Sequence, residues 1–114
     1  MATYLQRWQQ QIDQIKQELL ALGDMRPGAL SEQYNVCGKP NCRCKDPRKP
    51  QKHGPYYQLS YTHQGKSTTE FVKREMLQEV QLQLANYARF KALTEQWVQL
   101  SLRIAKLKRT QSTR

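Results

Sequence analysis

Residues 37–57 read CGKPNCRCKDPRKPQKHGPYY, and this stretch separates two segments whose apolar residues recur at helical spacing. Its residues 37–55 are rich in Pro and Gly and have no apolar periodicity, so they predict a loop. A loop with so few apolar residues cannot be ordered by burying a core of its own. Its three cysteines and its histidine offer another source of order.

These four residues are of the types that form structural zinc sites. Such sites take four tetrahedral nitrogen or sulfur ligands, and three Cys with one His is a common set. Neighbouring cations also favour the thiolate form that binds metal. We predict one zinc ion per chain, held by Cys37, Cys42, Cys44 and His53.

Other interpretations of the cysteines stay open at this stage. His63 competes as the fourth ligand, although its place beside a predicted turn suits a solvated residue better. An iron–sulfur cluster is a second alternative, and ordinary loop cysteines without a metal are a third. Three cysteines within eight residues favour a metal over disulfides, and with no secretory signal we expect a cytoplasmic protein.

The segments on either side of this stretch predict helices. In the first, six apolar residues recur at steps of three and four, and Gly23 ends the pattern. These residues are Leu5, Trp8, Ile12, Ile15, Leu19 and Leu22. The sequence therefore predicts a helix over residues 3–22, a longer one over 73–109, where Pro and Gly are absent, and a basic tail at 110–114.

A small sheet is predicted between the helices. Residues 56–61 and 67–72 are rich in aromatic and β-branched residues, and Gln64-Gly65 between them suits a tight hairpin turn. Residues 33–36 suggest a third short strand. The fold class expected is α+β, mostly α: one domain over 1–114, with the Cys/His loop and hairpin at 31–72.

The unequal helix lengths suggest an interface. At 1.5 Å per residue the long helix spans about 54 Å and the first about 30 Å. Antiparallel pairing that sets Leu22 near Met76 and Leu5 near Leu93 leaves the end of the long helix uncovered. We therefore predict a homodimer, or a partner helix, at an apolar stripe. Its residues are Phe90, Leu93, Trp97, Leu100, Ile104 and Leu107.

Positive charge gathers in the same Cys/His loop. The chain carries 19 Lys and Arg against 9 Asp and Glu, a formal net charge of +10, which favours polyanionic partners. Cations that neutralise phosphates, beside an aromatic that stacks on bases, are typical of nucleic-acid binders. The residues expected to contact DNA or RNA, between which the sequence does not decide, are Lys39, Arg43, Lys45, Arg48, Lys49, Lys52 and Tyr56.

The stretches CGKPNCRC at 37–44 and HGPYYQLSY at 53–61 resemble the signature of a family of small, uncharacterised prokaryotic proteins associated with mobile elements. The similarity covers residues 26–95 and includes Gly65-Lys66 and the stretch NYARFK at 86–91. The chain departs from that pattern at Gln58, where an aromatic residue is usual, and in a Pro- and Lys-rich insert at 46–52. The resemblance implies an accessory role in a transposon or phage and brings no catalytic residue.

Two functions follow as hypotheses. The first is a zinc-braced accessory protein that binds nucleic acid. The second is an adaptor that docks a larger, transposase-like protein through the C-terminal helix. We expect no enzymatic activity, because no acid pairs with a His in the central module and no nucleophile has a recognisable oxyanion element. A membrane partner is not expected either, since the apolar stripes are narrow.

Overall fold

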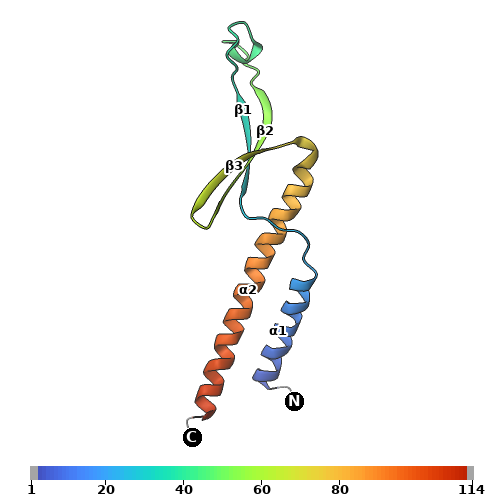
Figure 1. Cartoon of the computed structure of the whole chain (residues 1–114), viewed down its shortest axis with the longest axis vertical. Coiled ribbons are helices and arrows are strands. Elements are labelled where there is room, and N and C mark those ends of the chain that lie inside the picture. Colours follow the sequence, from blue (N-terminus) through green and yellow to red (C-terminus); the bar gives the residue numbers. More distant parts are fainter. Residues whose placement is uncertain (1–2, 113–114) are drawn as a thin grey trace. The chain divides into compact units, whose positions relative to one another are not determined.

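The computed structural model describes residues 3–112, which form two helices and a three-stranded sheet (Figure 1). In chain order the elements are α1 (Tyr4–Leu20), β1 (Ala29–Asn35), β2 (His53–His63), β3 (Lys66–Val72) and α2 (Leu77–Ser112). Short 3-10 turns occupy Arg43–Lys45 and Arg74–Met76. The predicted fold class is confirmed. The sheet is antiparallel in the order β1-β2-β3.

The chain divides into two compact units. One contains α1 and the part of α2 from Ala85 onward; the other comprises Arg26–Leu84, with the sheet and the Cys/His loop. α2 ends later than predicted, so the expected basic tail is helical as far as Ser112. Its last two residues, 113 and 114, lie outside the described residues.

α1 begins at a capping box. The Thr3 hydroxyl accepts a hydrogen bond from the Gln6 backbone N–H at 3.1 Å, and the Gln6 side chain accepts one from the Thr3 N–H at 3.0 Å. This reciprocal pair satisfies two amide groups that the helix itself leaves without partners. The helix then buries Ile12 and Ile15 from its apolar stripe.

Within this unit α1 runs antiparallel to α2, but in a register other than the predicted one (Figure 1). The side chain of Asn86 donates to the Asp24 carbonyl at 2.8 Å, and Arg89 pairs with Glu18 at 2.9 Å. Lys16 lies over the Trp97 ring. α1 therefore pairs with α2 from Asn86 onward. The expected contact of Leu5 with Leu93 is wrong.

This register removes the reason for the predicted interface. Leu93 and Leu100 are buried with Ile12 and Ile15, and Trp97 and Ile104 pack against this cluster, because α1 covers the stripe. Phe90 and Leu107, the outer members, are exposed and half-buried respectively. A homodimer and a docked partner stay predictions, now without an uncovered stripe to support them.

The sheet is longer than the sequence indicated. The predicted turn at Gln64-Gly65 is present, with both residues at positive φ, and His63 pairs with Lys66 across it. β2 extends back to His53, and β1 begins at Ala29, four residues before the predicted third strand. Leu59 is fully buried at the centre of β2.

The start of α2 lies beside β3 in the sheet unit. Val80, which is buried, lines one hollow together with Val72 and Glu70 of β3. The Arg26 backbone N–H also donates to the Gln83 carbonyl at 3.2 Å. The first and last residues of the segment 26–84 therefore lie close together in space. Neither described helix has an apolar stretch long enough to cross a bilayer.

Replacing Leu93 with Ala should lower the free energy of unfolding by about 2–5 kcal/mol, because the leucine is fully buried and its removal leaves a cavity. The matched control is Leu102→Ala on the same helix, where the leucine is 65% exposed; its expected cost is about 0.5 kcal/mol or less. Urea denaturation followed by circular dichroism measures both. Equal costs for the two variants would contradict the observed helix register.

Candidate metal centre

Pairing of β1 with β2 brings the ends of the Cys/His loop together. Asn35 lies opposite His53, so Cys37, two residues beyond Asn35, approaches the start of β2. The loop between them, residues 36–52, turns through the short 3-10 segment Arg43–Lys45. The three cysteines and His53 thus meet at one end of the sheet unit.

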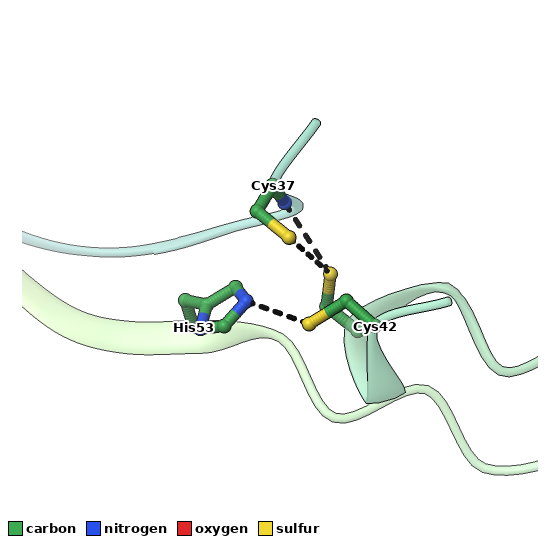
Figure 2. Close-up of side chains that lie close together, drawn as sticks. Cys37, Cys42 and His53 are labelled. Atoms are coloured by element: carbon green, nitrogen blue, oxygen red, sulfur yellow. Dashed lines mark hydrogen bonds between the residues drawn. The ribbon is translucent and has the colours of Figure 1, made fainter. Parts of the chain in front are cut away.

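The four potential ligand atoms form one tight group. They all lie within 4.8 Å of one another. The sulfurs of Cys37 and Cys44 are 3.5 Å apart, and the Cys42 sulfur lies 3.0 Å from Nε2 of His53. Figure 2 shows the His53 ring pointing from its strand toward the Cys42 sulfur. The four atoms could hold a metal ion.

This spacing fits a single tetrahedral ion. With zinc–sulfur bonds of about 2.3 Å, tetrahedral geometry separates two sulfurs by about 3.8 Å. The Cys37–Cys44 sulfur separation of 3.5 Å is close to that value, and all four ligand atoms lie within 4.8 Å of one another, so small side-chain shifts would complete the coordination. All three cysteines are free, and a sulfur separation of 3.5 Å is too long for a disulfide. An iron–sulfur cluster has a larger body and needs its ligands further apart.

The backbone of the loop supports this arrangement. The Cys42 N–H donates to the Lys39 carbonyl, and the Lys45 N–H donates to the Cys42 carbonyl at 3.0 Å. The Cys37 N–H donates to the Cys44 sulfur at 3.3 Å, a bond that strengthens once this sulfur is a thiolate. Cys44 is only 2% exposed. It is the one buried residue of the loop 36–52.

The thiols differ in acidity. The Cys44 backbone N–H, and then the Cys37 and Cys44 thiols, lower the pKa of Cys42 to about 6. Burial raises the pKa of Cys44 above its usual value. Near neutral pH the Cys42 sulfur is therefore largely the thiolate that metals bind. A metal has to displace the proton of Cys44.

Gly54 allows His53 to face the cysteines. Its φ is +137°, and a Cβ at this position would lie 2.7 Å from the Gln33 carbonyl oxygen. Only glycine tolerates both the conformation and the close approach. The glycine that follows the histidine therefore lets β1 and β2 come together where the cluster forms.

The structure also places the other predicted site residues. His63 is exposed beside the hairpin turn, at the opposite end of β2 from the cluster, so it is not the fourth member. The six loop cations are all exposed. Tyr57 and Tyr61 are half-buried on the same face as Leu59, whereas Tyr56 is 42% exposed.

One residue of interest escaped the sequence reasoning. Phe71 on β3 pairs with Gln58 and is 72% exposed. The turn at Gln64-Gly65 and strict alternation along the two strands place Phe71 on the same face as Tyr56. The signal was thus present in the sequence, although the sequence analysis did not single out Phe71.

Comparison with known proteins identifies a family. The model of a protein family described as a domain of unknown function, DUF6788, matches residues 5–82, which is more than half of the chain. No curated protein and no solved structure matches the chain. The family description names no ligand, so the metal centre rests on the geometry of the side chains.

Replacing His53 with Ala should weaken zinc binding by an order of magnitude or more, because it opens one of four coordination positions. His63→Ala is the matched control, since His63 lies outside the cluster, and it should keep one zinc per chain. Competition with a chromogenic chelator measures the affinity, and elemental analysis of reduced protein measures the content. Loss of zinc from both variants, or from neither, would refute this ligand set.

The acidity difference predicts an order of alkylation. In metal-free protein at about pH 7, iodoacetamide should modify Cys42 before Cys44, because the Cys42 pKa is lowered to about 6 and the Cys44 pKa is raised. Adding zinc should slow modification of both, and this protection should weaken as the pH falls and protons compete for the thiolates. Peptide mass mapping gives the rates. Faster modification of Cys44 would contradict the arrangement.

Proposed function

The chain belongs to the family described as a domain of unknown function, DUF6788, and we propose that its loop 36–52 is a zinc-braced, basic surface that binds nucleic acid. The observation that carries the proposal is the coincidence of two features in one loop. The Cys/His cluster closes the loop, and six exposed cations project from it.

The charge of these cations is not neutralised within the chain. No loop cation forms an ion pair with any residue between 3 and 112. The one acid of the loop, Asp46, accepts a hydrogen bond from the Arg48 backbone N–H at 2.9 Å. The acid therefore serves to turn the backbone, and the cations are available for an external polyanion.

Zinc contributes rigidity to this surface. Cations held on a fixed loop lose less conformational freedom on binding than cations on a mobile segment. An ion held by three thiolates and one imidazole carries a net charge of −1, which neighbouring cations stabilise. Metal and basic residues thus support each other, and phosphates are the chemical groups that such a surface attracts.

The cluster fits a structural role and not a catalytic one. Catalytic zinc sites keep one position open for water or substrate, whereas sites with four protein ligands are closed. Here the protein supplies four ligand atoms. The accessory role in a mobile element that the sequence resemblance implies stays a prediction, because the family description states no biological context.

The salt dependence of binding tests the proposal. Each phosphate contact contributes about 0.7–0.9 to the slope of log affinity against log salt concentration. Removing two loop charges with Arg48→Gln and Lys49→Gln should lower this slope by about 1.4–1.8. A control with the same loss of charge is Arg7→Gln with Lys91→Gln, on the two helices, which should leave the slope unchanged.

Fluorescence anisotropy with a labelled oligonucleotide at several salt concentrations supplies the measurement. Equal effects of the two charge variants would mean that binding follows net charge alone, and the loop assignment would fail. Removing zinc with a chelator should weaken binding at every salt concentration. Unchanged affinity of the metal-free protein would reject the bracing role.

A further inference from the structure

The two faces of the sheet differ in charge. One face, called here the open face, presents neutral side chains from all three strands. Cross-strand pairs on this face include Gln33 with Tyr56, Gln58 with Phe71, and Ser60 with Thr69. Gln33 donates to Gln58 at 2.7 Å, and the hydroxyls of Ser60 and Thr69 lie 3.3 Å apart. These contacts tie the polar groups of the open face together.

The carboxylates of the strands lie on the opposite face. Glu70 pairs with Leu59, and Glu32 pairs with Tyr57, so both alternate away from the open face. Glu70 forms an ion pair with Arg26 at 3.1 Å, and Glu32 accepts a hydrogen bond from the Tyr34 hydroxyl at 3.2 Å. The open face therefore presents no negative side chain from β1, β2 or β3 that would repel a phosphate.

Two exposed aromatic rings stand on this uncharged face. Phe71 is 72% exposed and Tyr56 is 42% exposed. Because Phe71 lies opposite Gln58, two residues along β2 from Tyr56, the two rings are diagonal neighbours on adjacent strands. Such neighbours lie about 7–8 Å apart. Neither ring stacks on another aromatic side chain anywhere in residues 3–112.

We propose that the open face binds a single strand of nucleic acid by stacking bases on Tyr56 and Phe71. This inference rests on the proposed function and narrows its partner to unpaired nucleic acid. In a duplex the bases stack on each other and offer only their edges, whereas an unpaired base offers its face to an aromatic ring. Side-by-side rings on a neutral face suit successive bases of one strand.

The loop cations lie where the backbone of that strand would run. Lys52 immediately precedes β2, and Tyr56 is four residues further along the chain. At about 3.3 Å per residue the two positions are about 13 Å apart, so a short strand reaches both. The loop then neutralises phosphates, and the open face holds the bases. The two parts make separable contributions to binding.

Binding of a single-stranded DNA oligonucleotide, an RNA of the same sequence and the matching DNA duplex tests the inference. The wild-type protein should bind both single strands more tightly than the duplex. Tyr56→Ala with Phe71→Ala should weaken single-strand binding about fivefold to a hundredfold and leave duplex binding unchanged. Tyr34→Ala is the matched control, because Tyr34 is also an exposed tyrosine of the sheet but contacts Glu32 on the opposite face.

Conservative variants show whether a loss of binding comes from the missing ring or from a folding defect. Phe71→Tyr keeps the ring and should bind single strands like wild type, whereas Phe71→Leu keeps an apolar side chain without the ring and should bind them less tightly. One outcome would overturn this inference but not the proposed function. In it, Phe71→Leu and the variant with Tyr56→Ala and Phe71→Ala bind single strands as tightly as wild type, whereas Arg48→Gln with Lys49→Gln still weakens binding. Duplex binding as tight as single-strand binding would also overturn it. Absence of any nucleic-acid binding by the wild type would overturn the proposed function with it.

Discussion

Pairing of Asn35 with His53 is the contact on which the central unit depends. It closes the loop 36–52 at its base, and closing a loop costs conformational entropy that the loop's own contacts must offset. Within that loop only Cys44 is buried, so apolar packing contributes little. The loop 36–52 is therefore held closed by two sets of contacts: the pairing of β1 with β2 at its base, and the cluster of three sulfurs and one imidazole.

Charge is organised around this closure. The cysteines, as thiolates, would place negative charge inside a loop whose outer surface is positive, and the two signs stabilise each other. The acids of the sheet are paired on the opposite face with Arg26 and Tyr34. In a chain of net charge +10, this unit thus carries a cationic loop next to a sheet face without charged side chains. In the interaction we propose, the loop would bind phosphates and the neutral face would bind bases of one polyanion.

Much of the fold and the Cys/His cluster could be predicted from the sequence, for identifiable reasons. Steps of three and four among apolar residues predicted both helices, and Gln64-Gly65 predicted the hairpin because Gly accepts the positive φ that a tight turn requires. Residue type alone was enough to bring Cys37, Cys42, Cys44 and His53 together as one predicted set. The helix register was not predictable, because periodicity identifies which face of a helix is buried and not which segment covers it. Phe71 was not predicted as a site residue, because hydrophobicity in a strand does not by itself tell a buried residue from an exposed one.

The backbone contact between Arg26 and Gln83 has a consequence for modularity. A segment whose entry and exit are adjacent resembles a domain inserted into a host chain, a topology that is often tolerated because the host needs only a short connection in its place. On the other side, Asp24 and Asn86 are likewise joined by a hydrogen bond. The helical hairpin and the sheet unit each have paired ends. We therefore expect that the sheet unit can be grafted onto another scaffold whose attachment points are equally close, and that the helical hairpin can carry another inserted domain.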